Sequence, residues 1–205
     1  MIFVGAGGHA FSLAEFASHD LEGYIAREPN SSFPFEWFGR DEEAQTLIDQ
    51  GKNFHITFIY SGLPVMEKRG ELIQKYKDMG CVFQTLIAPT AIVTPGSVIG
   101  EGCGVMHGSI VNRAKLGENC VVNSGAIVEH DCLIGDNTFI GPGVVIGGFT
   151  EIGKNCFIGL GARIGNGLKI GPDISVAMGA VVNKDLLEPG IYHGSPLRLF
   201  KIRRK

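Results

Sequence analysis

The chain has 205 residues, which is enough for one large domain or two small ones with a sizeable core. Its 18 Lys and Arg residues against 21 Asp and Glu residues give a formal net charge of −3, which argues against nucleic acid as a main partner. No apolar stretch reaches the roughly 20 residues of a membrane span. The first residues lack the pattern of a signal peptide, so we expect a cytoplasmic protein without a membrane span.

The composition changes near residue 85. Of the 30 glycines, nine precede residue 85 and 21 follow it, whereas 13 of the 18 aromatic residues precede it. We therefore expect two domains, a small one over residues 1–84 and a second one over residues 85–205 that includes a C-terminal tail.

The first domain has the pattern of a small α/β unit. Apolar runs predict strands at residues 1–5, 22–27, 54–60 and 81–87. Helical patterns extend to about residue 18 and cover residues 41–50 and 64–78. Strands that alternate with helices favour a parallel, Rossmann-like sheet.

A glycine-rich turn joins the first strand to the first helix. It consists of Gly5, Ala6, Gly7, Gly8 and His9. Such a turn presents backbone N–H groups to a phosphate, and the helix dipole adds to the attraction. A tight turn without a ligand is the alternative. The second strand ends in Arg27 and Glu28 rather than in a clear ribose-binding acid, and the unit is short, so NAD is not expected.

An aromatic segment, Phe33-Pro34-Phe35-Glu36-Trp37-Phe38, follows the second strand and is expected to be a loop. It would either stack on a nucleotide base or pack against the second domain or a neighbouring subunit.

From residue 87 an aliphatic side chain recurs every six residues. The first run is Ile87 to Val111 and the second, after one missing residue, is Leu116 to Val182. This period fits neither a helix nor one long strand. It predicts short strands separated by turns, three per coil, with the aliphatic side chains inside a prism. The coils would pair in parallel, about 4.8 Å apart.

Four of the five cysteines occupy one slot of this repeat, two residues before an aliphatic position: Cys103, Cys120, Cys132 and Cys156. The other residues of the slot are usually small, as at Ala126 and Thr138, so we expect buried thiols rather than disulfides or metal ligands. Cys81 lies outside this slot, and neither a disulfide nor a metal is expected.

Two hexapeptides, Ile-Gly-Asp-Asn-Thr-Phe (134–139) and Ile-Gly-Lys-Asn-Cys-Phe (152–157), resemble the repeats of the hexapeptide acyltransferases. The resemblance implies a left-handed parallel β-helix, whereas the general preference for right-handed crossovers predicts the opposite hand. With the glycine-rich turn added, the chain resembles the sugar acetyltransferases related to the bacillosamine-pathway N-acetyltransferase and the sialic-acid O-acetyltransferase. In the former, the turn and its histidine hold a nucleotide-linked amino sugar, which implies that role for Gly5, Ala6, Gly7, Gly8 and His9.

The turn after Val128 carries the candidate catalytic residues. Residues 123–132 resemble the catalytic turn of this subfamily, which implies that His130 is the general base and that Asp131 orients it. Glu129 is the competing orienting residue, and a merely exposed His130 is the alternative. An imidazole that is neutral near pH 7 suits the removal of a proton from an amine or hydroxyl that attacks a thioester.

An eighteen-residue coil places Gly148 directly above His130. Its missing side chain would leave room for the pantetheine arm of acetyl-CoA, and its N–H group could stabilise an oxyanion. The resemblance adds Leu160, Met178 and Gly179 as acetyl-CoA contacts and Asn123 near the reacting centre. Phe139 stands where many relatives have a histidine that contacts the cofactor, so that contact would be lost or replaced.

The resulting expectation is an acetyl-CoA-dependent N-acetyltransferase for a nucleotide-linked amino sugar, in surface polysaccharide or glycan precursor biosynthesis. It would act by direct attack on the thioester, as a homotrimer with active sites between adjacent prisms. The alternatives are a sugar O-acetyltransferase of the sialic-acid type and a binding or scaffold protein without catalysis.

Overall fold

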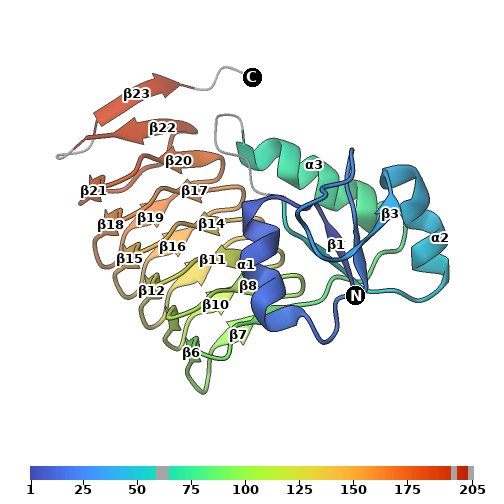
Figure 1. Ribbon diagram of the computed structural model, residues 1–205. Coiled ribbons are helices and arrows are strands. Elements are labelled where there is room, and N and C mark those ends of the chain that lie inside the picture. Colours follow the sequence, from blue (N-terminus) through green and yellow to red (C-terminus); the bar gives the residue numbers. More distant parts are fainter. Residues whose placement is uncertain (59–64, 195–197, 203–205) are drawn as a thin grey trace. The chain divides into compact units, whose positions relative to one another are not determined.

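The computed structural model describes residues 1–58, 65–194 and 198–202 (Figure 1). The chain divides into two compact units, Met1–Leu86 and Ile87–Lys205, two residues after the boundary expected from the composition. Within the described part of the chain, no helix has the length and apolar character needed to cross a membrane.

The first unit is built on a four-stranded parallel sheet with the order β3-β2-β1-β4. Its strands are β1 (Ile2–Val4), β2 (Gly23–Ile25), β3 (Glu36–Gly39) and β4 (Phe54–Ile56). Its helices are α1 (Gly8–Ala17), the 3-10 helix η1 (Asp41–Glu43), α2 (Ala44–Asp49) and α3 (Val65–Asp78). The predicted Rossmann-like α/β arrangement is confirmed.

Helix α1 forms where the sequence places apolar side chains on one face. It buries Ala10, Leu13, Ala14 and Ala17, which follow the i, i+3, i+4, i+7 spacing of one helical stripe. The glycine-rich turn before this helix leaves the carboxyl end of β1, where Gly5 N donates to Ile25 O of β2 at 2.8 Å.

The prediction of a loop over residues 33–38 is wrong for its second half, which forms the edge strand β3. The side chain of Phe33, only 4% exposed, packs against Phe3, Phe11 and Tyr24 of the same unit. Aromatic residues favour strands, and the cluster around Phe33 buries the ring that the prediction left free for a base or a neighbouring subunit.

The prediction of a strand over residues 81–87 is also wrong. Only Phe83 joins the sheet, through an isolated bridge to Phe54. Residues Leu86–Ile87 form β5, the first strand of the six-residue repeat, because the chain already follows that period at Ile87. The predicted strand end at residue 60 and the predicted helix start at residue 64 lie outside the described residues.

The second unit is a left-handed parallel β-helix of three sheets, as predicted. The eight-stranded sheet contains β5, β8 (Gly104–Val105), β11 (Val121–Val122), β14 (Phe139–Ile140), β17 (Phe157–Ile158), β20 (Ile174–Val176), β22 (Gly190–His193) and β23 (Arg198–Ile202). The six-stranded sheet contains β6 (Ile92–Val93), β9 (Ile110–Val111), β12 (Ile127–Val128), β15 (Val145–Ile146), β18 (Arg163–Ile164) and β21 (Val181–Val182). The five-stranded sheet contains β7 (Val98–Ile99), β10 (Lys115–Leu116), β13 (Leu133–Ile134), β16 (Glu151–Ile152) and β19 (Lys169–Ile170). Only β22 and β23 pair antiparallel among the described strands.

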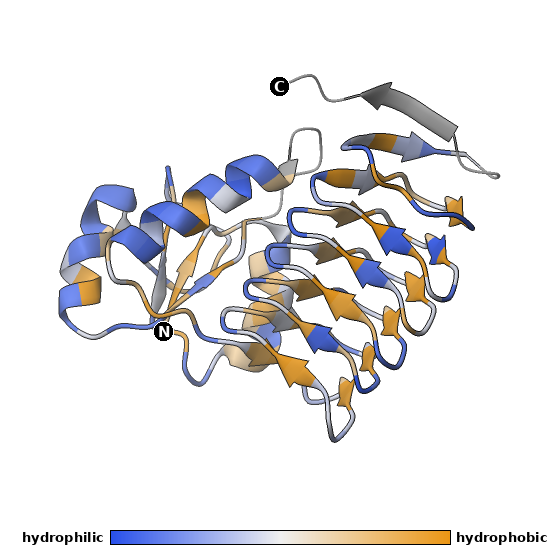
Figure 2. Ribbon diagram, turned by 180° about the vertical axis from the view of Figure 1, so that it is seen from behind, coloured by the Kyte–Doolittle hydropathy of each residue, from blue (hydrophilic) through white to orange (hydrophobic). Residues whose placement is uncertain are grey.

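The aliphatic column forms the core of this unit, and Figure 2 shows hydrophobic colour on successive stacked strands. Equivalent residues lie on each other in neighbouring coils, as in Val122 on Ile140 and Val128 on Ile146. The missing residue is absorbed in the turn at Arg113, whose φ of 50° is left-handed. The inward column therefore continues without a break.

The slot that holds the cysteines has a definite chemical role. Each of its four thiols is buried and donates to a glycine carbonyl, as from Cys132 Sγ to Gly147 O at 3.2 Å. Thr138 and Thr150 make the same bond from their hydroxyl groups at 2.9 and 2.8 Å. Where this slot holds Cys or one of these two Thr residues, its side chain is a buried donor to a glycine carbonyl, and the predicted burial of the four cysteines is confirmed.

We expect Thr150→Val to lower the free energy of unfolding by about 1–3 kcal/mol, because it removes the hydroxyl of the fully buried Thr150, which donates to the Gly165 carbonyl. The measurement is urea denaturation. Thr150→Cys keeps a donor that the chain itself uses in this slot and should lose less. Equal losses in the two variants would show that packing, and not the hydrogen bond, explains the effect.

Candidate functional site

The corner that follows β12 holds His130 and Asp131 against each other. His130 Nδ1 lies 2.9 Å from Asp131 Oδ2, and both side chains are a little under half exposed. Asp131 adopts a left-handed φ of 59°, a conformation that Asp tolerates well. With Nδ1–H donating to this carboxylate, Nε2 is left as the proton acceptor.

Glu129 makes different contacts. Its Oε2 accepts a hydrogen bond from Asn112 Nδ2 at 3.0 Å and lies 3.4 Å from the backbone nitrogen of His130. The ring of His130 therefore contacts the carboxylate of Asp131, while Glu129 fixes the backbone of the turn.

Gly148 lies against the imidazole, as the eighteen-residue stacking predicts. A Cβ atom at Gly148 would stand 2.9 Å from both Cε1 and Nε2 of His130. The expectation of open space for a pantetheine arm at this point is wrong, because the imidazole ring itself occupies it. The next residue, Phe149, places its ring centroid 5.0 Å from that of His130, at an interplanar angle of 89°.

The remaining predicted contacts lie at a different corner of the prism. Asn123, Leu160, Met178 and Gly179 follow strands of the eight-stranded sheet, whereas His130 and Gly148 follow strands of the six-stranded sheet. Leu160 and Met178 are 50% and 76% exposed, and Gly179 N donates to Leu160 O at 2.8 Å. Asn123 Oδ1 accepts from Ser124 N at 2.7 Å. Within one chain, Asn123, Leu160, Met178 and Gly179 therefore lie at a different corner of the prism from His130.

Phe139 is part of an aromatic stack. It is 5% exposed and lies parallel to Phe157, with centroids 5.0 Å apart and an interplanar angle of 8°. Its ring has no hydrogen-bonding atom, so a histidine-like contact from this position is replaced by apolar packing.

The glycine-rich turn borders a cavity of about 820 Å³ within the first unit. Gly5 has a φ of +107°, and a Cβ atom there would lie 2.8 Å from Thr57 Oγ1. That hydroxyl donates to the carbonyl oxygens of Val4 and Gly5. Gly5 is therefore required by the fold of the turn.

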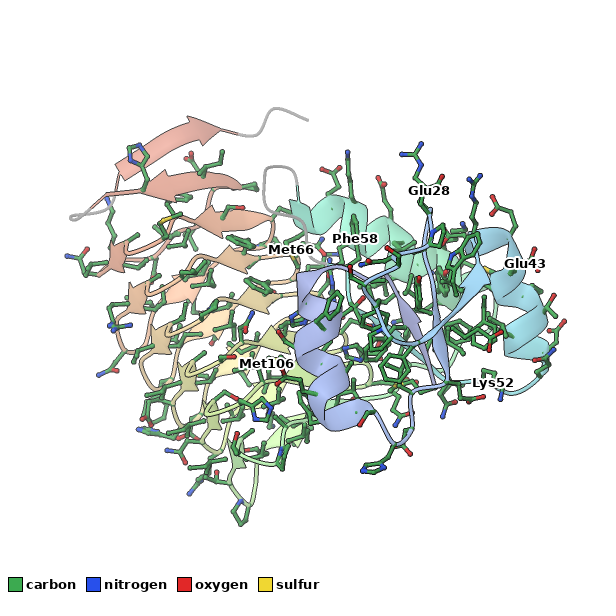
Figure 3. All side chains as sticks on the ribbon, in the orientation of Figure 1. Glu28, Glu43, Lys52, Phe58, Met66 and Met106 are labelled. Carbon is green, nitrogen blue, oxygen red and sulfur yellow. The ribbon has the colours of Figure 1, made fainter. Side chains whose placement is uncertain are left out.

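Gly7 and Gly8 face open space, since a Cβ atom at either would meet nothing within 4 Å. Helix α1 starts at Gly8 with no side-chain cap and no acidic residue in its first turn. The charged residues of the lining are two cations and three acids: Arg27, Lys68, Glu28 (labelled in Figure 3), Asp41 and Glu71. The attraction for an anion such as a diphosphate therefore comes from the N-terminus of α1 and the open backbone of the turn, and not from an excess of positive side chains.

His9 lines this cavity, and burial keeps its ring and that of the neighbouring His55 neutral. Burial lowers the pKa of His9 to about 3, and the repulsion that a protonated His9 would meet from a protonated His55 and from Arg69 lowers it further. Burial likewise lowers the pKa of His55 to about 4, although its bond to the Gln84 carbonyl opposes the shift. The Nε2 atoms of both rings are buried without a hydrogen-bond partner. His9 is thus the second residue of α1 and a partly buried one, not an isolated turn residue.

Several residues of the two sites were not predicted from the sequence. Asn30 ties the turn to the segment after β2, through Asn30 Nδ2 to Ala6 O at 2.7 Å. Lys68 gives no sequence signal, because it is one of many lysines on helix surfaces. Phe149 does give a sequence signal, because it is an aromatic residue at the position that Asp131 occupies one coil earlier. Among the described residues, no group of three or more His, Cys, Asp or Glu could hold a metal ion.

Comparisons with known protein families match the middle of the β-helix. Residues 113–148 match the family described as bacterial transferase hexapeptide (six repeats), and residues 150–184 match the hexapeptide repeat of succinyl-transferase. These two segments of the second unit are therefore similar to hexapeptide repeats of transferases.

Solved structures match almost the entire chain. PerB from Caulobacter crescentus, in complex with CoA and GDP-perosamine, is 28% identical with a TM-score of 0.88, over 98% of this chain and 96% of that one. A histidine variant of perosamine N-acetyltransferase from the same bacterium has a TM-score of 0.89, with the same identity and coverage. The acetyltransferase domain of PglB from Neisseria gonorrhoeae, with acetyl coenzyme A, is 27% identical with a TM-score of 0.87, over 97% and 98% of the two chains. The chain resembles the sugar N-acetyltransferases, as expected from its sequence.

The glycines of the turn allow a paired test of the cavity. We expect Gly7→Val to fold with a wild-type thermal midpoint, because the new side chain would enter open space. The same side chain would occupy the space next to the turn and should reduce the binding of a nucleoside diphosphate. Gly5→Val should instead lower the thermal midpoint, because its Cβ would clash with Thr57 at a positive φ. Calorimetric titration and thermal scanning measure the two effects. Unchanged binding in Gly7→Val would contradict a site at this turn.

Stability should fall in mild acid because of His9 and His55. An unfolded histidine titrates near about 6.5, whereas the folded pKa values are about 3 and about 4. The unfolded chain therefore takes up more protons below pH 6.5, so the stability contributed by the two histidines is complete above that pH and is lost as the pH falls through about 4 for His55 and about 3 for His9. Thermal midpoints of His9→Gln and His55→Gln should depend less on pH in this window. The exposed His19→Gln is the control, and equal pH dependence in all variants would contradict the assignment.

Proposed function

We propose that the chain is an acetyl-CoA-dependent N-acetyltransferase that acts on a nucleotide-linked amino sugar. The observation that carries the proposal is the match over nearly the whole chain to structures that contain CoA with GDP-perosamine, and acetyl coenzyme A. The His130–Asp131 pair supports it, because this pair offers a proton acceptor where an amine must lose a proton. A cytoplasmic location remains a prediction.

His130 acts in this proposal as the general base. The amine of the sugar attacks the thioester carbonyl carbon of acetyl-CoA, a cosubstrate that supplies the activated acetyl group. Nε2 of His130 accepts the proton of the amine as the C–N bond forms, and it returns a proton to the thiolate as the C–S bond breaks. The products are the N-acetylated sugar and CoA. Asp131 holds the Nδ1–H tautomer and stabilises the imidazolium that forms.

We assign acetyl-CoA contacts to Gly148, through its backbone beside the base, and to Leu160, Met178 and Gly179. The two groups occupy different corners of one prism, so a complete site requires the second corner from another copy of the chain. A homotrimer would supply it, with His130 of one protomer facing the Leu160 corner of the next. Exposed apolar side chains at that corner, Leu160 and Met178, are of the kind found in binding sites and interfaces.

The nucleotide part of the acceptor is assigned to the cavity at the glycine-rich turn. Gly5 and Ala6 shape the turn, Gly7 and Gly8 leave its surface open, and His9 presents a neutral ring. The N-terminus of α1 would bind the diphosphate. Asn123 is proposed to contact the amino sugar near the reacting centre.

The test of the base is His130→Ala, followed by the release of CoA thiol with GDP- and UDP-linked amino sugars and with sialic acid. Turnover should fall by about 10²–10⁴, and the residual rate should rise with pH as the amine loses its proton without help. Asp131→Asn should lose less, because it changes only the orientation and charge of the imidazole. The exposed His19→Ala is the matched control.

Thermal midpoints distinguish chemistry from folding in this test. His130 lies at a corner and adds no side chain to the core, so its replacement should leave the midpoint unchanged. Wild-type turnover in His130→Ala would contradict the role of His130 as general base, and the rate would then come from the proximity of the two substrates. Transfer to sialic acid alone would contradict an amino-sugar acceptor.

A further inference from the structure

Phe149 adopts a backbone conformation that does not suit it. Its φ is 61°, in the left-handed region, where a side chain with a Cβ atom is strained. Among the described residues, the other non-glycine residues with positive φ are Asn, Asp and Arg. Phe149 is also 62% exposed, so burial of its ring does not compensate the strain. The turns of the repeat impose this conformation, and almost all of the other positions that adopt it are Gly, Asn or Asp, so an exposed aromatic residue here needs a separate reason.

The reason is indicated by what Phe149 touches. Its backbone N donates to the carbonyl oxygen of His130 at 2.9 Å. Its ring stands perpendicular to the imidazole, 5.0 Å away between centroids. The same imidazole is bounded by the Asp131 carboxylate and by the backbone of Gly148.

A histidine ring needs such contacts to hold one orientation. Rotation about its second side-chain torsion has a broad profile, so rotamer preference alone does not fix the plane of the ring. The His130–Asp131 pair is partly exposed, and a pair of this kind is weak by itself. Its single hydrogen bond fixes Nδ1 but lets the ring tilt about that atom.

We propose that Phe149 is a positioning residue, which holds the plane of the His130 imidazole so that Nε2 points at the acceptor amine. The proposal rests on the proposed role of His130 as general base. Phe149 would act through the ring of His130 and not by contact with either substrate. Misplacement of a catalytic group by about 1 Å can cost about 10²-fold in rate. Replacement of Phe149 should therefore lower kcat and leave substrate binding unchanged.

The test is Phe149→Asn, assayed for CoA release with both substrates varied. We expect kcat to fall about tenfold, within that range, with the two KM values unchanged. Phe149→Tyr keeps the ring and should keep most of the rate. The thermal midpoint of Phe149→Asn should stay level or rise, because Asn119, Asn137 and Asn155 already adopt this conformation in the chain. A lower midpoint would indicate a structural role and overturn the proposal. Leu187→Asn, which also removes an exposed apolar side chain, is the control.

A double-mutant cycle with His130→Ala separates positioning from direct contact. If Phe149 acts through the imidazole, Phe149→Asn should cause no further loss once His130 is absent. The same fold loss in both backgrounds, or a rise in either KM, would overturn the proposal in favour of substrate contact. Normal kcat in Phe149→Asn, with His130→Ala inactive, would overturn the positioning role alone. Wild-type turnover in His130→Ala would overturn the base, and the positioning role with it.

Discussion

In the β-helix, the backbone of each coil hydrogen-bonds to the next, as from Val121 N to Thr138 O and from Glu129 N to Ile146 O. This pairing fixes the register, so that a residue is always covered by its equivalent one coil later. The inward column, the cysteine and threonine slot and the left-handed corners all depend on it. The one-residue deletion at Arg113 is tolerated because it falls in a turn, where it leaves the strand pairing unchanged.

The same register assembles the corner of His130. Asp131, Gly148 and Phe149 surround the imidazole because the chain returns to the same position after each coil, and no long-range loop is needed. A residue at a corner faces outward, so its side chain is free for chemistry while the strands on either side carry the stability. The glycine-rich turn of the first unit is not built by such a repeat. Its open surface depends on two glycines, Gly7 and Gly8, and on a helix that has no side-chain cap.

The architecture was predictable from the sequence because it follows from one period. The prediction of a loop over residues 33–38 was wrong because the structure there depends on tertiary packing. β3 lacks an alternating pattern, and the burial of Phe33 depends on three rings from other parts of the sequence. The contact between His130 and Gly148 was predictable, but the ring filling that space depends on a side-chain torsion. The separation of Leu160 from His130 was available in the sequence. Both residues follow an aliphatic position by two, and these positions, Val128 and Ile158, are thirty residues apart, which is not a whole number of eighteen-residue coils.

The thiol-to-carbonyl bonds have a consequence for how opening of this molecule can be observed. Cys103, Cys120 and Cys156 lie in one column of the prism, each in a different coil, and none is accessible to solvent. A thiol reagent can reach one of them only when its own coil separates from the next. In a stack that contacts only its neighbours, such separations are local and begin at the ends. The rate at which each cysteine is alkylated therefore reports how readily its own coil separates from the next one, without any introduced label.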